Sequence, residues 1–274
     1  MPGCDSGVEM EDLLVDNLVS VTSVISPQDT LLVAYLYSAQ PLGQIAFEDS
    51  ALIKDAQVII HDGKAGDTLS YNALSKRYEA ERNYLNIVPS GEYFLSIKTK
   101  EGSTIQGSCI IPSSPEMPKI SGEYQGDDYY FEVEWRNPSN HRFYTFFALG
   151  NGFYESDVYD ELDPQFAPRY LQIDAQLTDD TLYPSDGQQE NNSVRGIVYS
   201  AKIADNPTLL ITLRNIDEPL YNYLDTYRDY SDWAANNEGS LFPNFQDFRP
   251  IYSNIENGLG VFAGSNQVTK KIQL

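Results

Sequence analysis

Polar and apolar residues alternate along several short stretches between residues 18 and 112. Alternation over four to eight residues is typical of a strand with one buried face, because successive side chains point to opposite sides. Turn residues such as Asp62-Gly63 and Pro89-Ser90-Gly91 separate the stretches, and no helical period lies between them. These features predict an antiparallel sandwich over residues 18–112. Its predicted strands include Val19–Ile25, Leu31–Tyr37, Ala56–Ile60, Tyr93–Ile97 and Ile105–Ile111.

A second β domain is predicted after a proline-rich boundary. Three prolines and two serines lie between Pro112 and Pro118, and such a segment is stiff and cannot sit inside a sheet. Longer alternating stretches follow, such as the run from Tyr129 to Trp135. We therefore predict a domain over residues 119–274 that is either barrel-like or a second sandwich, and we favour the barrel-like form. Residues 1–17 precede both domains as a tether.

One amphipathic helix is predicted at about residues 218–234. Asp217 or Glu218 can cap it, and Pro219 suits the first turn. Its apolar stripe recurs at helical spacing, so we expect this stripe to lie against the sheet, with polar residues such as Asp225 opposite. The stripe consists of Leu220, Tyr223, Leu224 and Tyr227.

The composition excludes several classes of function. With 40 acidic and 18 basic residues, the net charge is −22, which repels phosphate backbones and anionic headgroups. We therefore expect no nucleic-acid partner and no basic face that docks on a membrane. Cations or basic partners are electrostatically better suited to this surface. The alternative is that the acidity serves only to keep the protein soluble. No apolar run reaches the length of a membrane-spanning helix. A hydrophobic content of 41% with 20 Tyr and 12 Phe argues against a disordered chain.

The two cysteines have different predicted roles. Gly3-Cys4 is followed by an acidic stretch and resembles the end of a bacterial lipoprotein signal, although no charged and apolar leader precedes it. Cys4 is therefore a candidate for lipidation, and an ordinary cysteine near the terminus is the alternative. Cys109 lies in an alternating stretch, which favours a buried free thiol in a strand over a nucleophile. No disulfide framework is expected.

Motifs of the common enzyme classes are absent from the sequence. It contains no Gly-x-Ser-x-Gly elbow, no His-Glu-x-x-His and no phosphate-binding or dinucleotide fingerprint. His61 and His141 fall in different predicted domains, which disfavours a catalytic triad, and His61 has no companion ligands for a metal. A pair of carboxylates acting as in glycosidases stays open, but 40 acidic residues give no basis for choosing two. We expect no enzymatic activity.

Two groups of residues are candidates for binding. The acidic loop around Asp157, Asp160 and Asp163 offers oxygen ligands for Ca²⁺, but it lacks the spacing of an EF-hand, so a solvated loop without a cofactor is the main expectation. Both tryptophans and most tyrosines lie after residue 118, and such side chains suit sugars, peptides or a partner protein. The candidate contact residues are Tyr221, Tyr230, Trp233, Phe242 and Phe245.

A glycine-rich stretch from Pro250 to Gly264 is the most specific feature of the sequence. Asn257-Gly258 predicts a turn, and a short apolar strand follows it. The residues Tyr252, Ser253, Asn254, Ile255, Asn257, Gly258, Leu259, Gly260 and Phe262 form a pattern written YSNIxNGLGxF. This signature resembles the one near the carboxyl end of a Bacteroidetes outer-membrane lipoprotein family, domain of unknown function 4249. We expect the signature to close the second domain, together with the loop before it.

The resemblance implies a location and a role. Members of that family are outer-membrane lipoproteins, and their genes commonly neighbour TonB-dependent receptors. The resemblance therefore implies a protein anchored at the cell surface or the periplasmic face by its N-terminal lipid alone, acting as an accessory binding subunit of such a transporter with an unknown ligand. The stretches Ala56–Gly63 and Ser90–Ile97 also resemble immunoglobulin-like or transthyretin-like modules. A structural or adhesive surface lipoprotein is the alternative, followed by a carbohydrate-active enzyme.

Overall fold

The computed structural model describes residues 18–38, 51–126, 128–136, 144–151, 191–198, 208–237 and 250–274. These residues form thirteen strands and one helix, which confirms the prediction of a mainly antiparallel all-β protein. In chain order they are β1 (Val19–Ile25), β2 (Leu31–Ser38), β3 (Gln57–His61), β4 (Gly66–Asn72), β5 (Arg77–Glu81), β6 (Glu92–Lys98), β7 (Thr104–Ile110), β8 (Lys119–Gln125), β9 (Asp128–Arg136), β10 (Tyr144–Asn151), β11 (Asn191–Val198), β12 (Thr208–Ile216), α1 (Glu218–Asn237) and β13 (Leu259–Gln273).

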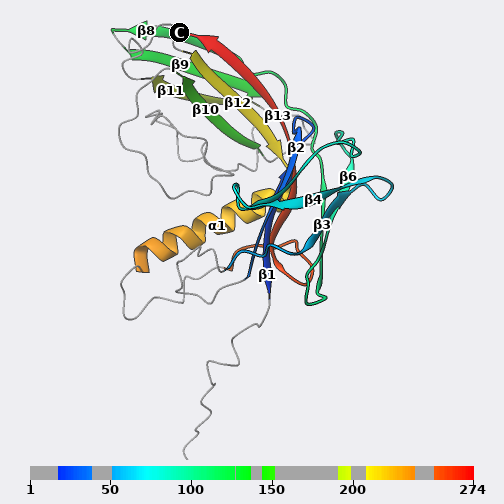
Figure 1. Ribbon diagram of the computed structural model, residues 1–274. Coiled ribbons are helices and arrows are strands. Elements are labelled where there is room, and N and C mark those ends of the chain that lie inside the picture. The colour runs from blue at the N-terminus through cyan, green and yellow to red at the C-terminus, as the bar shows by residue number, and fades with distance from the viewer. Residues whose placement is uncertain are drawn as a thin grey trace, which may run out of the picture.

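The strands form two sheets. The larger has the order β10-β12-β13-β1-β2-β5-β4-β3-β6-β7, and the smaller has the order β11-β9-β8. β13 pairs in parallel with β1 through its first half and antiparallel with β12 through the rest. Figure 1 shows β13 passing from the level of β1 to the end of the molecule where β8 and β9 lie. Within the described residues neither sheet closes on itself, so the barrel-like form that we favoured is wrong.

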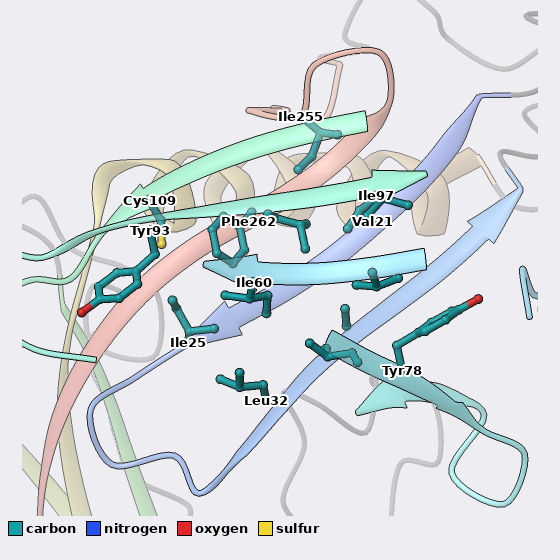
Figure 2. Packing of buried hydrophobic residues seen from close by; sticks show 14 of the residues in the cluster. Val21, Ile25, Leu32, Ile60, Tyr78, Tyr93, Ile97, Cys109, Ile255 and Phe262 are labelled. Atoms are coloured by element: carbon teal, nitrogen blue, oxygen red, sulfur yellow. The ribbon is translucent and has the colours of Figure 1, made fainter. Parts of the chain in front are cut away.

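The first hydrophobic core lies between the strands of the amino-terminal sandwich. β1 alternates as predicted, with Val19, Val21, Ser23 and Ile25 buried. Cys109 is a buried free thiol on β7, as the sequence predicted, and burial raises its pKa well above the usual range. Phe262 points from β13 into the same core, beside residues of the amino-terminal strands (Figure 2). Burial of that ring alone contributes about 1.5–3 kcal/mol.

The second core lies between two facing sheets at the other end of the molecule. Alternate residues of β9, from Tyr129 to Trp135, pack against Leu209, Ile211 and Leu213 of β12. Val268 and Ile272 of β13 and Ile120 of β8 cover its side. The second region is therefore a two-layer sandwich, the other form that the sequence allowed.

The signature lies in the first core, not the second. Ile255 and Phe262 are members of the first core, and residues 259–264 pair with β1. Our expectation that the signature closes the second domain is wrong, because β13 returns to the amino-terminal strands before it joins β12. The side chain of Asn266 donates to the carbonyl of Pro112, and Asn215 donates to Ser113, so β13 and β12 also hold the proline-rich boundary.

Candidate functional site

Helix α1 carries a row of aromatic side chains along one stripe. The ring centroids of Tyr223 and Tyr227 lie 6.1 Å apart, those of Tyr227 and Tyr230 6.5 Å, and those of Tyr230 and Trp233 6.2 Å. Steps of four, three and three residues keep the four side chains on one side of a helix. We call these four residues the aromatic row.

The aromatic row offers flat apolar faces with polar edges. Tyr227 is 39% exposed, and the other three members are partly exposed. Asp229 lies four residues before Trp233 and so borders the row, whereas its ion-pair partner Arg228 (3.9 Å) lies farther round the helix, as does Asp225, which pairs with Arg228 at 2.8 Å. Aromatic faces bordered by charged groups suit a ligand that has an apolar face and a polar rim.

Asp217 fixes the beginning of α1 onto β13. Its Oδ1 accepts a hydrogen bond from the backbone N–H of Leu220 at 3.0 Å, as an N-cap does, and its Oδ2 accepts one from Gly264 at 2.8 Å. The Asp217 N–H donates in turn to the Gly264 carbonyl at 3.0 Å. Burial raises the pKa of the Asp217 carboxyl to about 7, although the hydrogen bonds from Gly264 and Leu220 act in the opposite direction.

The apolar side of α1 packs on the outer face of β13. Leu220 is buried with Ile216, Val261 and Ala263, while Tyr221, Tyr223 and Leu224 lie around them; we call this the helix–sheet cluster. Residues 260–266 of β13 are consequently buried on both faces. The helix exists because this stripe is buried, and the same packing sets the direction in which the aromatic row projects.

Tyr252 of the signature holds the middle of α1. Its backbone N–H donates to the hydroxyl of Thr226 at 2.8 Å, and that hydroxyl donates to the Asn222 carbonyl at 2.7 Å. Burial raises the pKa of Tyr252, the nearby carboxyls of Glu218 and Asp217 add to this rise, and a hydrogen bond with the Asn222 side chain opposes it. The signature therefore positions the helix that bears the aromatic row.

Asn254 joins β13 to the edge of β7. Its Nδ2 donates to the carbonyls of Ser108 at 3.0 Å and Phe262 at 2.7 Å, and its Oδ1 accepts from the Phe262 N–H at 3.0 Å. Two backbone hydrogen bonds between Glu256 and Gln106 continue this contact. The amide side chain thus takes the place of a strand at the end of the sheet.

The signature glycines allow close backbone contact. Gly260 has a φ of +103°, and a Cβ there would collide with the carbonyl oxygen of Val21. A Cβ on Gly258 would lie 2.8 Å from the carbonyl oxygen of Val19. Asn257 has a φ of +58°, and its Nδ2 donates to the Thr104 carbonyl at 3.1 Å. The signature is thus explained by packing and hydrogen bonding.

The structure places some predicted contact residues in the aromatic row. Tyr230 and Trp233 belong to it, whereas Tyr221 packs in the helix–sheet cluster. Tyr223 and Tyr227 also belong to the row, although the sequence analysis assigned both to the stripe against the sheet. For Tyr227 that assignment is wrong, because its ring is exposed. The four-three-three spacing of the aromatic residues was the signal that could have identified the row.

Several predicted residues lie outside the described part of the chain. These are Cys4, Phe242, Phe245, Asp157, Asp160 and Asp163. Among the described residues no group of three or more His, Cys, Asp or Glu is arranged to hold a metal ion. No described helix combines the length and the hydropathy needed to cross a membrane.

Comparison with known proteins identifies one family. A family model described as a domain of unknown function (DUF4249) matches residues 7–271, nearly the whole chain. No curated protein matches the sequence.

Proposed function

The chain belongs to the DUF4249 family of proteins, and on this premise we propose that it is a binding protein of the cell envelope that captures a ligand on the aromatic row of α1. The observation that carries the proposal is the row itself, in which four rings follow one another at centroid distances of 6.1–6.5 Å. Such rings bind flat partners by stacking, because the partner's apolar face is buried while its polar edges stay in contact with water.

The ligand that fits the row has flat faces and polar edges, as sugar rings and aromatic peptide side chains do. Asp229, four residues before Trp233, places a carboxylate at the border of the row, and its ion-pair partner Arg228 lies farther round the helix. Charged groups at the border of an apolar surface fix the orientation of a ligand, whereas the buried rings provide most of the affinity. No catalytic group or cofactor is needed for this role.

We extend the proposal to location and partner. A lipid on Cys4 anchors the protein in the outer membrane, at the cell surface or the periplasmic face, and a TonB-dependent receptor takes up the captured ligand. The support for this extension is the Gly3-Cys4 step with the acidic stretch behind it, and the resemblance of the signature described above. A purely structural or adhesive role would require no soluble ligand and no receptor.

Variants of the aromatic row test the capture of a ligand. Soluble glucan, xylan and mannan oligosaccharides and a set of tryptic peptides are screened by thermal shift, and positive compounds are measured by calorimetry. Trp233→Ala and Tyr230→Ala are expected to weaken binding tenfold or more, since Trp and Tyr side chains carry most of the energy of such contacts. Tyr84→Ala is the matched control, because Tyr84 is 76% exposed and lies outside the row. Binding that survives both row variants would rule out the row as the site.

The extension is tested with the full-length lipoprotein from native membranes. Affinity purification is expected to recover a TonB-dependent receptor, and labelled palmitate is expected to enter the protein but not its Cys4→Ser variant. Recovery of the lipidated protein without a receptor would favour the structural or adhesive role instead.

A further inference from the structure

Strand β8 forms an open edge of the second sandwich. It ends the order β11-β9-β8, and no other described strand pairs with its outer side. All its residues except Ile120 are exposed, although the strand is seven residues long. It contains no proline, and its one lysine already pairs with Glu134 at 3.0 Å. Proteins usually protect such an edge with proline, bulges or inward charges, so an unprotected edge is a site for pairing with another strand.

The charges along β8 specify a partner strand. Lys119 and Glu123 lie four residues apart, and in a strand this spacing puts both on the same face, with Ser121 between them. A neighbouring antiparallel strand complements this pattern when it carries Glu opposite Lys119 and Lys opposite Glu123. β8 itself has this pattern when it is turned by a two-fold axis through Ser121.

We propose that two copies of this chain associate by antiparallel pairing of β8 with β8. In this register Lys119 of each copy faces Glu123 of the second copy, which gives two opposite-charge pairs about the axis. Lys119 then lies between Glu134 of its own sheet and Glu123 of the second copy, so positive and negative groups alternate across the joined sheets. The two three-stranded sheets become one six-stranded sheet with an isologous contact.

The other face of the same strand adds apolar contact. Ile120 and Tyr124 point towards the second core, and Tyr124 is 47% exposed although its ring packs edge-on against Tyr129 at 5.2 Å. In the proposed register Ile120 lies opposite Gly122 of the second copy and Tyr124 lies opposite its Pro118, so the pairing covers part of this exposed ring. The contact of one strand pair is at the small end of protein interfaces, and the net charge of −22 opposes association, so we expect a weak dimer with a dissociation constant of about 100 µM.

Charge-reversed variants test the register. The sedimentation of the whole chain is measured from about 10 µM to about 1 mM in about 0.15 M salt, which screens long-range repulsion. Lys119→Glu and Glu123→Lys are each expected to weaken self-association about tenfold, because each places like charges opposite one another twice. An equimolar mixture of the two variants is expected to restore association, since every pair is then of opposite sign. The restored mixture also shows that both variants are folded.

A cysteine at the axis provides an independent test. In a Cys4→Ser background, Ser121→Cys is expected to form a disulfide between copies under mild oxidation. Gln125→Cys is the matched control on the same exposed face, where the two sulfurs would be separated by eight residues of strand, or about 27 Å. A chain that stays monomeric at about 1 mM, or a dimer that both charge variants leave unchanged, would overturn the proposal.

Discussion

The two sandwiches end their sheets in different ways. In the first, the edge of β7 is covered by the signature, whose Asn254 and Glu256 replace a further strand with side-chain and backbone hydrogen bonds. In the second, β8 ends the sheet and all its residues except Ile120 are exposed. The signature thus closes one edge and positions α1, whereas the other edge is the one that our proposal assigns to contact between two copies. Substitutions at the two edges should therefore differ in their effect on stability.

Substitution of Gly260 should do the most damage. Gly260→Ala puts a Cβ onto the Val21 carbonyl oxygen at a φ of +103°, so β13 must separate from β1. We expect a loss of about 4 kcal/mol or more in the free energy of unfolding, measured with urea. Gly102→Ala is the control, because Gly102 has a φ of +94° and nothing within 4 Å of its Cβ position, and it should lose only about 1 kcal/mol. Equal losses would show that backbone strain, and not the approach of β13 to β1, explains the glycine.

Removal of the Asn254 amide should open the covered edge. Asn254→Ala leaves the carbonyls of Ser108 and Phe262 and the Phe262 N–H without this partner. The expected loss is about 2–4 kcal/mol, because each abandoned group costs about 1 kcal/mol or more. Amide hydrogen exchange should increase along β7 and β13 but not along β9. Asn83→Ala is the control, since the Asn83 side chain makes one exposed hydrogen bond, to Glu81. Unchanged exchange at β7 would contradict edge closure by the signature.

The pH dependence of stability should reveal the contact that Asp217 makes between α1 and β13. The folded pKa of Asp217 is about 7, above its ordinary 3.8, so between these values the folded chain holds a proton that the unfolded chain lacks. Stability from this group is therefore present at low pH and falls as the pH rises towards 7, by at most about 1.4 kcal/mol per pH unit. Burial likewise raises the pKa of Asp29, to about 6, so this group also makes stability fall as the pH rises, but over a lower pH range.

Asp217→Asn should flatten the slope between pH 6 and 7, as measured by urea unfolding at each pH. Protonation of the many carboxylates at low pH reduces repulsion between negative charges, which also raises stability as the pH falls. The contribution of Asp217 is therefore the difference in slope between wild type and variant. Parallel curves for the two proteins would refute the assignment. Asp29→Asn serves as the comparison, because it should change the slope below pH 6.

The open edge should tolerate substitution in the monomer. Lys119→Gln removes an exposed ion pair with Glu134, and the expected change in the free energy of unfolding is below about 0.5 kcal/mol. Urea unfolding at low protein concentration measures it. If Lys119→Gln lowered the free energy of unfolding as much as Asn254→Ala, the β8 edge would contribute to the stability of the monomer, contrary to this prediction.

Local features of the fold were predictable from the sequence. The alternation of β1, the helix after Asp217 and the buried thiol of Cys109 were all expected, because each depends on residues a few positions apart. β2 shows the limit of this approach. Its predicted alternation began at Leu31, but Leu32, Ala34 and Leu36 are buried, and of the predicted set only Tyr35 is buried with them. Both faces of this strand are apolar, so the sequence does not show which face is buried.

Pairing between distant segments was not predictable in the same way. Nothing local marks β13 as the parallel neighbour of β1, and a proline-rich boundary suggested that the two halves fold apart. The aromatic row was missed in part for a similar reason: the spacing of Tyr227 fits both the stripe that packs and the row that projects. Only the position of β13 under α1 distinguishes the side chains that pack on the sheet from those that project from the helix.

The position of β13 has a consequence for biosynthesis. The ribosome makes β1 long before it makes residue 259, yet these two segments lie next to each other. During that interval β1 can pair only with β2, and the backbone hydrogen-bonding groups on its other side stay open to pairing with other strands. Pairing over such a sequence distance is slow. A holding chaperone would therefore help most before the signature emerges, and a chain interrupted ahead of it would be a substrate for proteases.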